Sequence, residues 1–114
     1  MLVHGSKDPA WNQPFIDLKN EVCKLIPDAV VTLACLQLGS PSLDEVVLEL
    51  QTQGVKSAVV VPVFLSSLGH VTKDIPVLVE KVAGKHPGLS LSVSKAVGEF
   101  PEVKKAIVNT IAGV

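Results

Sequence analysis

Residues 29–50 read AVVTLACLQLGSPSLDEVVLEL, and this stretch decides the fold. Its first part, residues 29–36, is an apolar run that barely alternates with polar residues, which is typical of a strand buried on both faces. Its second part predicts a helix, because Pro41 fits a first helical position and Ser42 with Glu45 has the spacing of a capping box. A buried strand followed by an amphipathic helix is the repeating unit of a parallel sheet covered by helices.

One strand–helix unit precedes this stretch and two follow it. The preceding unit is a short apolar start, residues 1–3, that leads through His4-Gly5-Ser6 into a helix. The next strand, residues 57–64, contains a continuous run of apolar core residues. Its regular pairing is expected to weaken at Pro62, which has no N–H to donate. A polar loop leads from this strand to a third helix. The last strand alternates apolar residues with serines, as a half-exposed edge strand does, and the last helix begins near Glu99. The residues expected on the inward faces of the first and last helices are Trp11, Phe15, Leu18, Val22, Leu25 and Ile26, and Val103, Ala106, Ile107 and Ile111.

Four strand–helix units with right-handed crossovers predict an α/β domain of three layers, α/β/α. The expected core is a four-stranded parallel sheet in the order 2-1-3-4, which places a topological switch point between strands 1 and 3. The chain has 114 residues, of which 47% are hydrophobic and 18% charged, and contains no linker, repeat or low-complexity tract. Residues 1–114 are therefore expected to form a single domain.

The charge balance argues against several kinds of partner. Ten lysines, no arginine and eleven acidic residues leave a formal net charge of −1, which does not favour nucleic acid. Without arginine, an anionic ligand must be held by lysines, hydroxyls or backbone amides. No apolar run reaches the roughly 18 residues of a membrane-spanning helix, and no signal peptide is visible, so we expect a cytoplasmic protein with no membrane partner. Cys23 and Cys35 have no metal-site spacing and are expected to be reduced, buried thiols.

Polar side chains follow the strands at the carboxyl edge of the predicted sheet. His4 ends strand 1, Gln37 ends strand 2, and His70 lies a few residues beyond strand 3. Open α/β sheets bind ligands at this edge. Two neutral imidazoles are an incomplete coordination shell, which suits transient handling of a divalent transition metal and leaves room for a substrate. His86 lies in a turn far from this edge and is expected to be structural.

Residues 66–74 add hydroxyls, a lysine and backbone amides just before a helix, where an anion is favoured. An ordinary capped loop has the same composition, so both interpretations stand for this segment. A serine hydrolase is disfavoured because no Gly-X-Ser-X-Gly elbow is present and the chain is less than half the length that this fold needs. Nucleotide enzymes are also disfavoured because neither common glycine-rich phosphate loop is present.

Two motifs together resemble a known family. They are Leu2-Val3-His4-Gly5-Ser6-Lys7-Asp8-Pro9 and Val61-Pro62-Val63-Phe64-Leu65-Ser66-Ser67-Leu68-Gly69-His70-Val71-Thr72-Lys73-Asp74-Ile75-Pro76. With residues 36–43 and 97–103 in the same order and spacing, the chain resembles, nearly end to end, the small CbiX-type chelatases. These are the sirohydrochlorin cobaltochelatases and ferrochelatases of the class II chelatase superfamily.

The resemblance implies a lyase that inserts Co²⁺ or Fe²⁺ into sirohydrochlorin, in cobalamin or sirohaem biosynthesis. It implies no nucleotide and no permanently bound cofactor, since the metal is a substrate. By the family pattern, His4 and His70 bind the incoming metal and help to take up the pyrrole protons. The residues expected to contact the carboxylate-rich tetrapyrrole are Ser6, Lys7, Gln37, Ser66, Ser67, Gly69 and Lys73.

The chain departs from the family pattern at Gln37, where a glutamate is usual. A neutral amide cannot take up a proton at neutral pH and is a poorer metal ligand than a carboxylate. The alternative is therefore a non-catalytic metal or tetrapyrrole carrier that retains the chelatase fold. The three residues before His4 make a short first strand, which predicts missing N-terminal residues. Because members of the superfamily often carry two such lobes, residues 1–114 are expected to be a half-unit that forms a homodimer.

Overall fold

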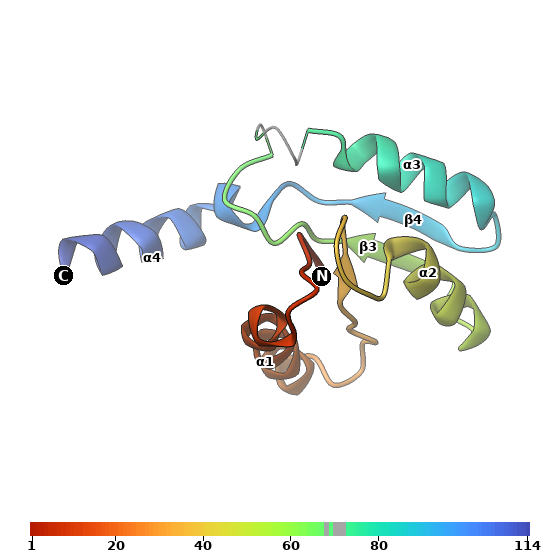
Figure 1. Cartoon of the computed structure of the whole chain (residues 1–114), viewed down its shortest axis with the longest axis horizontal. Helices are drawn as coiled ribbons and strands as arrows, with labels where there is room; N and C mark the ends of the chain where they lie inside the picture. The colour runs from red at the N-terminus through yellow and green to blue at the C-terminus, as the bar shows by residue number, and fades with distance from the viewer. Residues whose placement is uncertain (68, 70–72) are drawn as a thin grey trace.

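Strands and helices alternate along the chain, as the sequence predicts. Figure 1 shows the computed structural model, which describes residues 1–67, 69 and 73–114. The elements in chain order are β1 (Leu2–Val3), α1 (Pro9–Leu25), β2 (Ala34–Cys35), α2 (Leu43–Thr52), β3 (Ser57–Val60), α3 (Ile75–Lys85), β4 (Ser90–Val93), the 3-10 helix η1 (Val97–Glu99) and α4 (Pro101–Ala112). Within this described part of the chain, no helix is both long and apolar enough to span a membrane.

The strands form two parallel pairs, β1 with β2 and β3 with β4, joined by one bridge. Leu2 bridges Pro62 in parallel orientation, with the Leu2 N–H donating to the Val61 carbonyl at 2.9 Å and the Val63 N–H donating to the Leu2 carbonyl at 2.8 Å. The bridge places β1 beside the chain just after β3, so the order across the molecule is 2-1-3-4. The predicted fold class and strand order are confirmed.

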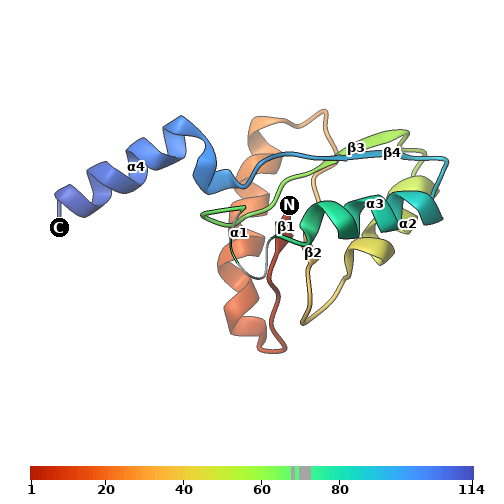
Figure 2. The ribbon, with the colours of Figure 1, turned by 90° about the horizontal axis from the view of Figure 1, so that it is seen from above.

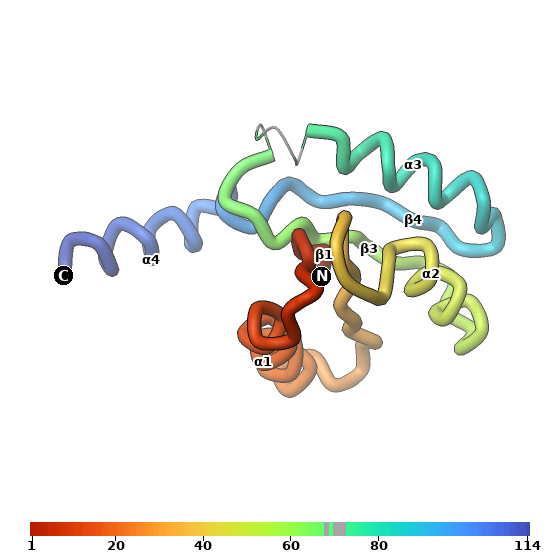
Figure 3. The backbone as a smooth tube through the Cα atoms, viewed as in Figure 1, coloured from red at the N-terminus to blue at the C-terminus, as the bar shows by residue number. Residues whose placement is uncertain are grey.

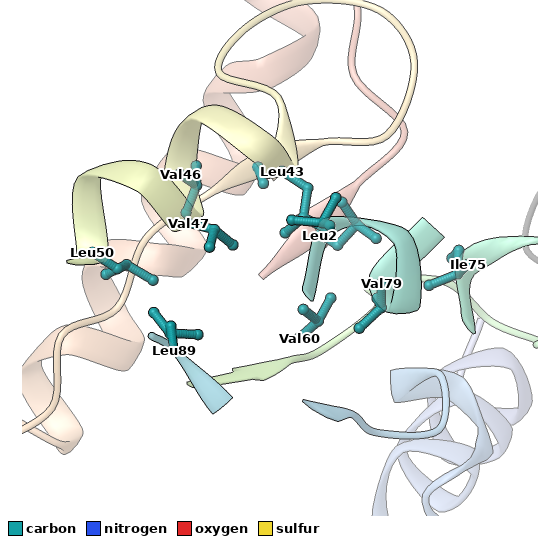
Figure 4. Packing of buried hydrophobic residues seen from close by; sticks show 11 residues of the cluster. Leu2, Leu43, Val46, Val47, Leu50, Val60, Ile75, Val79 and Leu89 are labelled. Carbon is teal, nitrogen blue, oxygen red and sulfur yellow. The ribbon is translucent and has the colours of Figure 1, made fainter. Parts of the chain in front are cut away.

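The core lies between the strands and the helices α2 and α3 (Figure 4). Leu2 is fully buried, and the strand residue Val60 and the helix residues Val47 and Val79 are nearly so. The predicted capping box of α2 is present, because the Ser42 hydroxyl accepts a hydrogen bond from the Glu45 N–H at 3.2 Å. The helix begins at Leu43 rather than at Pro41, which lies before the cap in a cis peptide bond with Ser40. The four buried residues of α2 are Leu43, Val46, Val47 and Leu50.

The second strand is shorter than its apolar sequence predicts. Residues 29–33 lie outside β2, and Val30 is 58% exposed. The physical reason is the partner strand: β1 has only two residues, so it can pair with only two residues of β2. An apolar sequence alone cannot make a strand where no backbone partner is available.

The last helix also differs from expectation. Its apolar residues were expected to face inward, but α4 has no buried residue and Ile111 is 69% exposed. Figures 2 and 3 show α4 leading away from the rest of the molecule. The first helix likewise has no fully buried side chain, and Leu25, expected on its inward face, is 82% exposed. One layer of the predicted three-layer arrangement is therefore incompletely packed within one copy of the chain.

Candidate functional site

His4 lies directly after β1, at the carboxyl edge of the sheet. The pairing with the second strand continues past the strand ends, because the Leu36 N–H donates to the Val3 carbonyl at 2.7 Å and the Gln37 N–H donates to the His4 carbonyl at 3.2 Å. Gln37 is therefore a direct backbone neighbour of His4, as the strand order predicts. The structure brings these two predicted site residues together.

Gly5 allows this close approach of the two chain segments. Its φ of +91° lies in the left-handed region, and a Cβ atom there would collide with the Leu38 carbonyl oxygen. A residue with a side chain would be strained by its backbone and would also push the Gln37-Leu38 segment away from His4.

The imidazole of His4 has a defined hydrogen bond. Its Nδ1 lies 3.0 Å from the Gly5 carbonyl oxygen. A carbonyl only accepts hydrogen bonds, so Nδ1 carries the proton of the neutral ring and Nε2 keeps the lone pair. A lone pair on Nε2 is what either a divalent metal ion or a departing pyrrole proton requires.

An aromatic side chain lies beside this imidazole. The ring centroid of Trp11 is 6.2 Å from that of His4, in an edge arrangement. The ring centroid of Phe15 is 5.2 Å from that of Trp11. Trp11 is 42% exposed, so part of its indole surface remains accessible next to His4. A flat apolar surface of this kind can contact a macrocycle.

The predicted contacts Ser6 and Lys7 lie at the entry to α1. The Ser6 hydroxyl accepts from the Asp8 N–H at 3.1 Å, and its carbonyl accepts from the Asn12 side-chain amide at 3.1 Å. Asp8 then caps the helix by accepting from the Ala10 N–H at 2.9 Å. Ser6 thus helps to build the helix start, while Lys7 is exposed.

Glu99 is a residue of the site region to which the sequence analysis assigned no role. Its carboxylate accepts from the Ser67 N–H at 3.0 Å and from the Ser67 hydroxyl at 2.9 Å. The same hydroxyl accepts from the Ala96 N–H at 3.1 Å. The backbone hydrogen bond from Ser67, and then its hydroxyl, lower the pKa of Glu99 below its ordinary value of 4.5. Glu99 and Ser67 together hold the start of the loop that carries the second histidine motif.

Gly98 supports the same attachment. The Gly98 N–H donates to the Phe64 carbonyl at 2.9 Å, and a Cβ atom on Gly98 would collide with the backbone of Leu65. The sequence signal for this attachment was the pair Gly98 and Glu99, which lies in residues 97–103, a segment that the family resemblance includes.

The remaining predicted site residues are placed as follows. Ser66 and Lys73 are exposed, and the Gly69 carbonyl accepts from the Lys73 N–H at 3.0 Å. His70 lies outside the described residues. Among the residues that the structure does describe, no group of three or more histidine, cysteine, aspartate or glutamate side chains could hold a metal ion.

His86 and the cysteines have structural surroundings. The ring of His86 lies between Gln51 Oε1 and Asp44 Oδ1, at 2.9 Å from each, so it ties the end of α3 to α2 as a structural histidine does. Both cysteines are unpaired, as predicted. Cys35 is buried, and burial raises its pKa. Cys23 is only half-buried.

Comparison with known proteins decides the family. A model of the CbiX family matches residues 1–114. The chain belongs to the CbiX family. It is 34% identical over 73 residues to the sirohydrochlorin cobaltochelatase of Methanosarcina acetivorans, a match that covers 64% of this chain and 56% of that protein. This CbiX chain therefore spans little more than half the length of that curated relative.

Two solved structures resemble the CbiX chain along nearly its whole length. A putative cobalamin (vitamin B12) biosynthesis CbiX protein from Marinobacter aquaeolei VT8 matches with a TM-score of 0.82 and 33% identity, over 98% of this chain and 88% of that one. SirB from Bacillus subtilis with Fe³⁺ matches with a TM-score of 0.75 and 28% identity, over 99% of this chain but only 46% of SirB. The fold is thus chelatase-like.

Proposed function

We propose that this chain inserts a divalent metal ion, Co²⁺ or Fe²⁺, into sirohydrochlorin, as a lyase of cobalamin or sirohaem biosynthesis. The observation that carries the proposal is the lone pair on His4 Nε2, which the Nδ1 hydrogen bond to Gly5 fixes at the carboxyl edge of the sheet. Membership of the CbiX family and similarity to a sirohydrochlorin cobaltochelatase support it.

The chemistry needs two exchanges at the macrocycle. The metal ion must lose part of its hydration shell, and two pyrrole N–H groups must lose their protons as the metal–nitrogen bonds form. In the proposal, His4 and His70 first ligate the metal and then accept protons, because a neutral imidazole is a competent base near pH 7. Neither step requires a nucleotide or a resident cofactor.

The substrate contacts come from residues around the same edge. Lys7 and Lys73 are exposed cations that can meet the carboxylates of sirohydrochlorin in contacts that stay open to solvent. Trp11 offers an apolar surface beside His4. The remaining proposed contacts are Ser6, Gln37, Ser66, Ser67 and Gly69. Because Ser6 and Ser67 already hold their own loops, their part in the proposal is mainly to position those loops.

The oligomeric state and the cellular compartment of the protein are proposed on separate grounds. The match to only 46% of SirB supports residues 1–114 as one lobe of a two-lobed arrangement, with a second copy as the other lobe of a homodimer. The two unpaired cysteines support a reducing compartment, the cytoplasm.

A direct assay tests this function. Purified protein is incubated with sirohydrochlorin and Co²⁺ or Fe²⁺ at matched free concentrations, and the absorption spectrum of the macrocycle is followed. The proposal expects insertion faster than the spontaneous reaction with at least one metal, and the ratio of the two rates shows which metal is preferred. A rate equal to the spontaneous one with both metals would refute it.

Gln37 favours one alternative function, a metal or tetrapyrrole carrier that does not catalyse insertion. The backbone pairing places this amide beside His4, where a carboxylate would be a stronger ligand and a base. The variant Gln37→Glu separates the two functions. A carrier binds sirohydrochlorin without inserting metal, and Gln37→Glu then raises insertion from the spontaneous rate. A chelatase inserts metal as wild type, and the variant changes its rate only modestly.

A further inference from the structure

Three large exposed apolar side chains lie at the carboxyl edge of the sheet, where His4 lies. The helix after β1 carries Trp11, which is 42% exposed. The segment after β2 carries Leu38, which is 45% exposed, and the loop after β3 carries Leu65, which is 72% exposed. We call these three residues the apolar rim. Single exposed apolar residues are normal on a protein surface, but three of them on neighbouring segments of one sheet edge indicate a contact surface.

Leu38 is held against the segment that carries His4. The Gln37 N–H donates to the His4 carbonyl at 3.2 Å. The Leu38 carbonyl oxygen then lies so close to Gly5 that a Cβ atom on this glycine would collide with it. Leu38 therefore has a fixed place beside His4.

Leu65 lies on the other side of β1. The Val63 N–H donates to the Leu2 carbonyl at 2.8 Å, and Leu65 follows two residues later. The backbone of Leu65 also packs so closely against Gly98 that a Cβ atom there would collide with it. The apolar rim thus has one leucine on each side of the strand that leads to His4, and Trp11 on the helix beside it.

Two further contacts fix Trp11 next to His4. The ring centroid of Phe15, one helical turn later, is 5.2 Å from that of Trp11. The side-chain amide of Asn12 donates to the Ser6 carbonyl at 3.1 Å, which ties the first turn of α1 to the segment that carries His4. An indole that is already in position loses little conformational freedom when a ligand contacts it, so the contact favours binding.

The chemistry around the apolar rim fits the face of a flat macrocycle with an anionic periphery. The ring centroids of Trp11 and His4 are 6.2 Å apart, and a tetrapyrrole is wide enough to contact both. Lys7, an exposed cation in the same segment, can meet a carboxylate. Ion pairs between exposed groups add little net affinity, and the chain has no arginine to form bidentate pairs. The apolar faces of the macrocycle, which gain free energy by leaving water, then supply most of the affinity.

We propose that the apolar rim binds the face of the tetrapyrrole, with Trp11 as its main contact, and that the substrate carboxylates add little to the affinity. The inference rests on the proposed function and adds to it three residues that set the affinity for the macrocycle without taking part in the chemistry. The chain then selects its substrate by the shape of the ring more than by the number of carboxylates.

The first test follows the binding of metal-free sirohydrochlorin through its absorption spectrum. Trp11→Ala is expected to weaken binding by at least about tenfold, because it removes the largest apolar face of the rim. Trp11→Phe is expected to restore most of the loss. In insertion assays the effect of Trp11→Ala is expected in KM and not in kcat, since His4 is unchanged. Raising the salt from about 0.1 M to about 1 M screens exposed charges and is expected not to weaken wild-type binding.

The second test compares leucines inside and outside the apolar rim. Leu38→Ser and Leu65→Ser are each expected to weaken binding by about threefold or more. The control is Leu48→Ser, because Leu48 is 58% exposed but lies on α2, and it is expected to bind as wild type. Hydroxyl-radical labelling of the wild type, read by mass spectrometry, is expected to show that bound macrocycle shields Trp11 and Leu65 but not Leu48. Far-UV circular dichroism checks that the variants are folded.

The outcomes separate this inference from the proposed function. Failure of the wild type to bind sirohydrochlorin, wild-type affinity in Trp11→Ala, equal effects of Leu38→Ser and Leu48→Ser, or loss of wild-type binding at high salt would each overturn the inference. A wild type that binds the macrocycle through the apolar rim but inserts no metal would refute the chelatase function and support the inference.

Discussion

Gly5 holds the candidate imidazole in place through its backbone. Its positive φ and its contact with the Leu38 carbonyl leave no room for a Cβ atom. We expect Gly5→Ala to lower the free energy of unfolding by about 2–4 kcal/mol, since it combines backbone strain with a steric clash. The measurement is urea unfolding followed by circular dichroism.

Gly84 provides the matched control for this substitution. It lies within α3, and a Cβ atom there would have no neighbour within 4 Å. Gly84→Ala is expected to stabilise the protein by about 0.5–1 kcal/mol, because alanine loses less conformational freedom in a helix. If the two variants changed stability equally, the steric account of Gly5 would be wrong.

For single residues, the sequence predicted the edge of the sheet at which a residue lies better than it predicted the hydrogen bonds of that residue. The meeting of His4 and Gln37 followed from strand order, because parallel strands end at one edge. The proton on His4 Nδ1 did not follow, since it depends on where the Gly5 carbonyl points. The pairing of Glu99 with Ser67 joins residues 32 positions apart, and no local periodicity reports such a contact.

Among the elements, η1 and the loop after β3 depend on an ionised carboxylate. The pKa of Glu99 is lowered by its hydrogen bonds to Ser67, so the folded state prefers the ionised form. This contribution to stability is present above the ordinary pKa of 4.5 and is lost as the pH falls through the lowered value. We therefore expect Glu99→Gln to be less stable than wild type at pH 7 and the difference to shrink in acid.

Thermal unfolding of wild type and of Glu99→Gln between pH 7 and pH 3 measures how the difference in their stability shrinks. The variant Glu102→Gln is the control, because Glu102 is an exposed carboxylate on the next helix. A stability difference between wild type and Glu99→Gln that did not change with pH would contradict the assigned role.

Helices α2 and α3 are joined at one end by His86. Its ring is only 13% exposed and lies at 2.9 Å from both Asp44 and Gln51. Replacing it by alanine removes both hydrogen bonds, so we expect His86→Ala to lower the free energy of unfolding by about 1–3 kcal/mol. Chemical denaturation measures the loss. No loss of stability would show that the two contacts are not structural.

At the scale of elements, the sequence predicted best those elements whose signals are local. The capped helix α2 and the edge strand β4 match their sequence patterns, because capping and alternation are local. The lengths of β2 and β3 were overestimated, since β1 pairs with only two residues of β2 and β4 pairs with only four residues of β3. The apolar residues of α4 were expected to face inward and are not buried, because a sequence pattern shows which residues share one side of a helix but not whether another element covers that side.

For the whole molecule, the central claim is that His4 carries out the chemistry of metal insertion. The most direct measurement is the rate of Co²⁺ insertion into sirohydrochlorin by His4→Ala, together with the affinity of the variant for metal-free sirohydrochlorin. His86→Ala, which removes a histidine distant from the site, is the control. We predict a fall of at least about 100-fold in rate for His4→Ala, with substrate affinity nearly unchanged and a wild-type rate for His86→Ala. A wild-type rate of insertion by His4→Ala would contradict the claim.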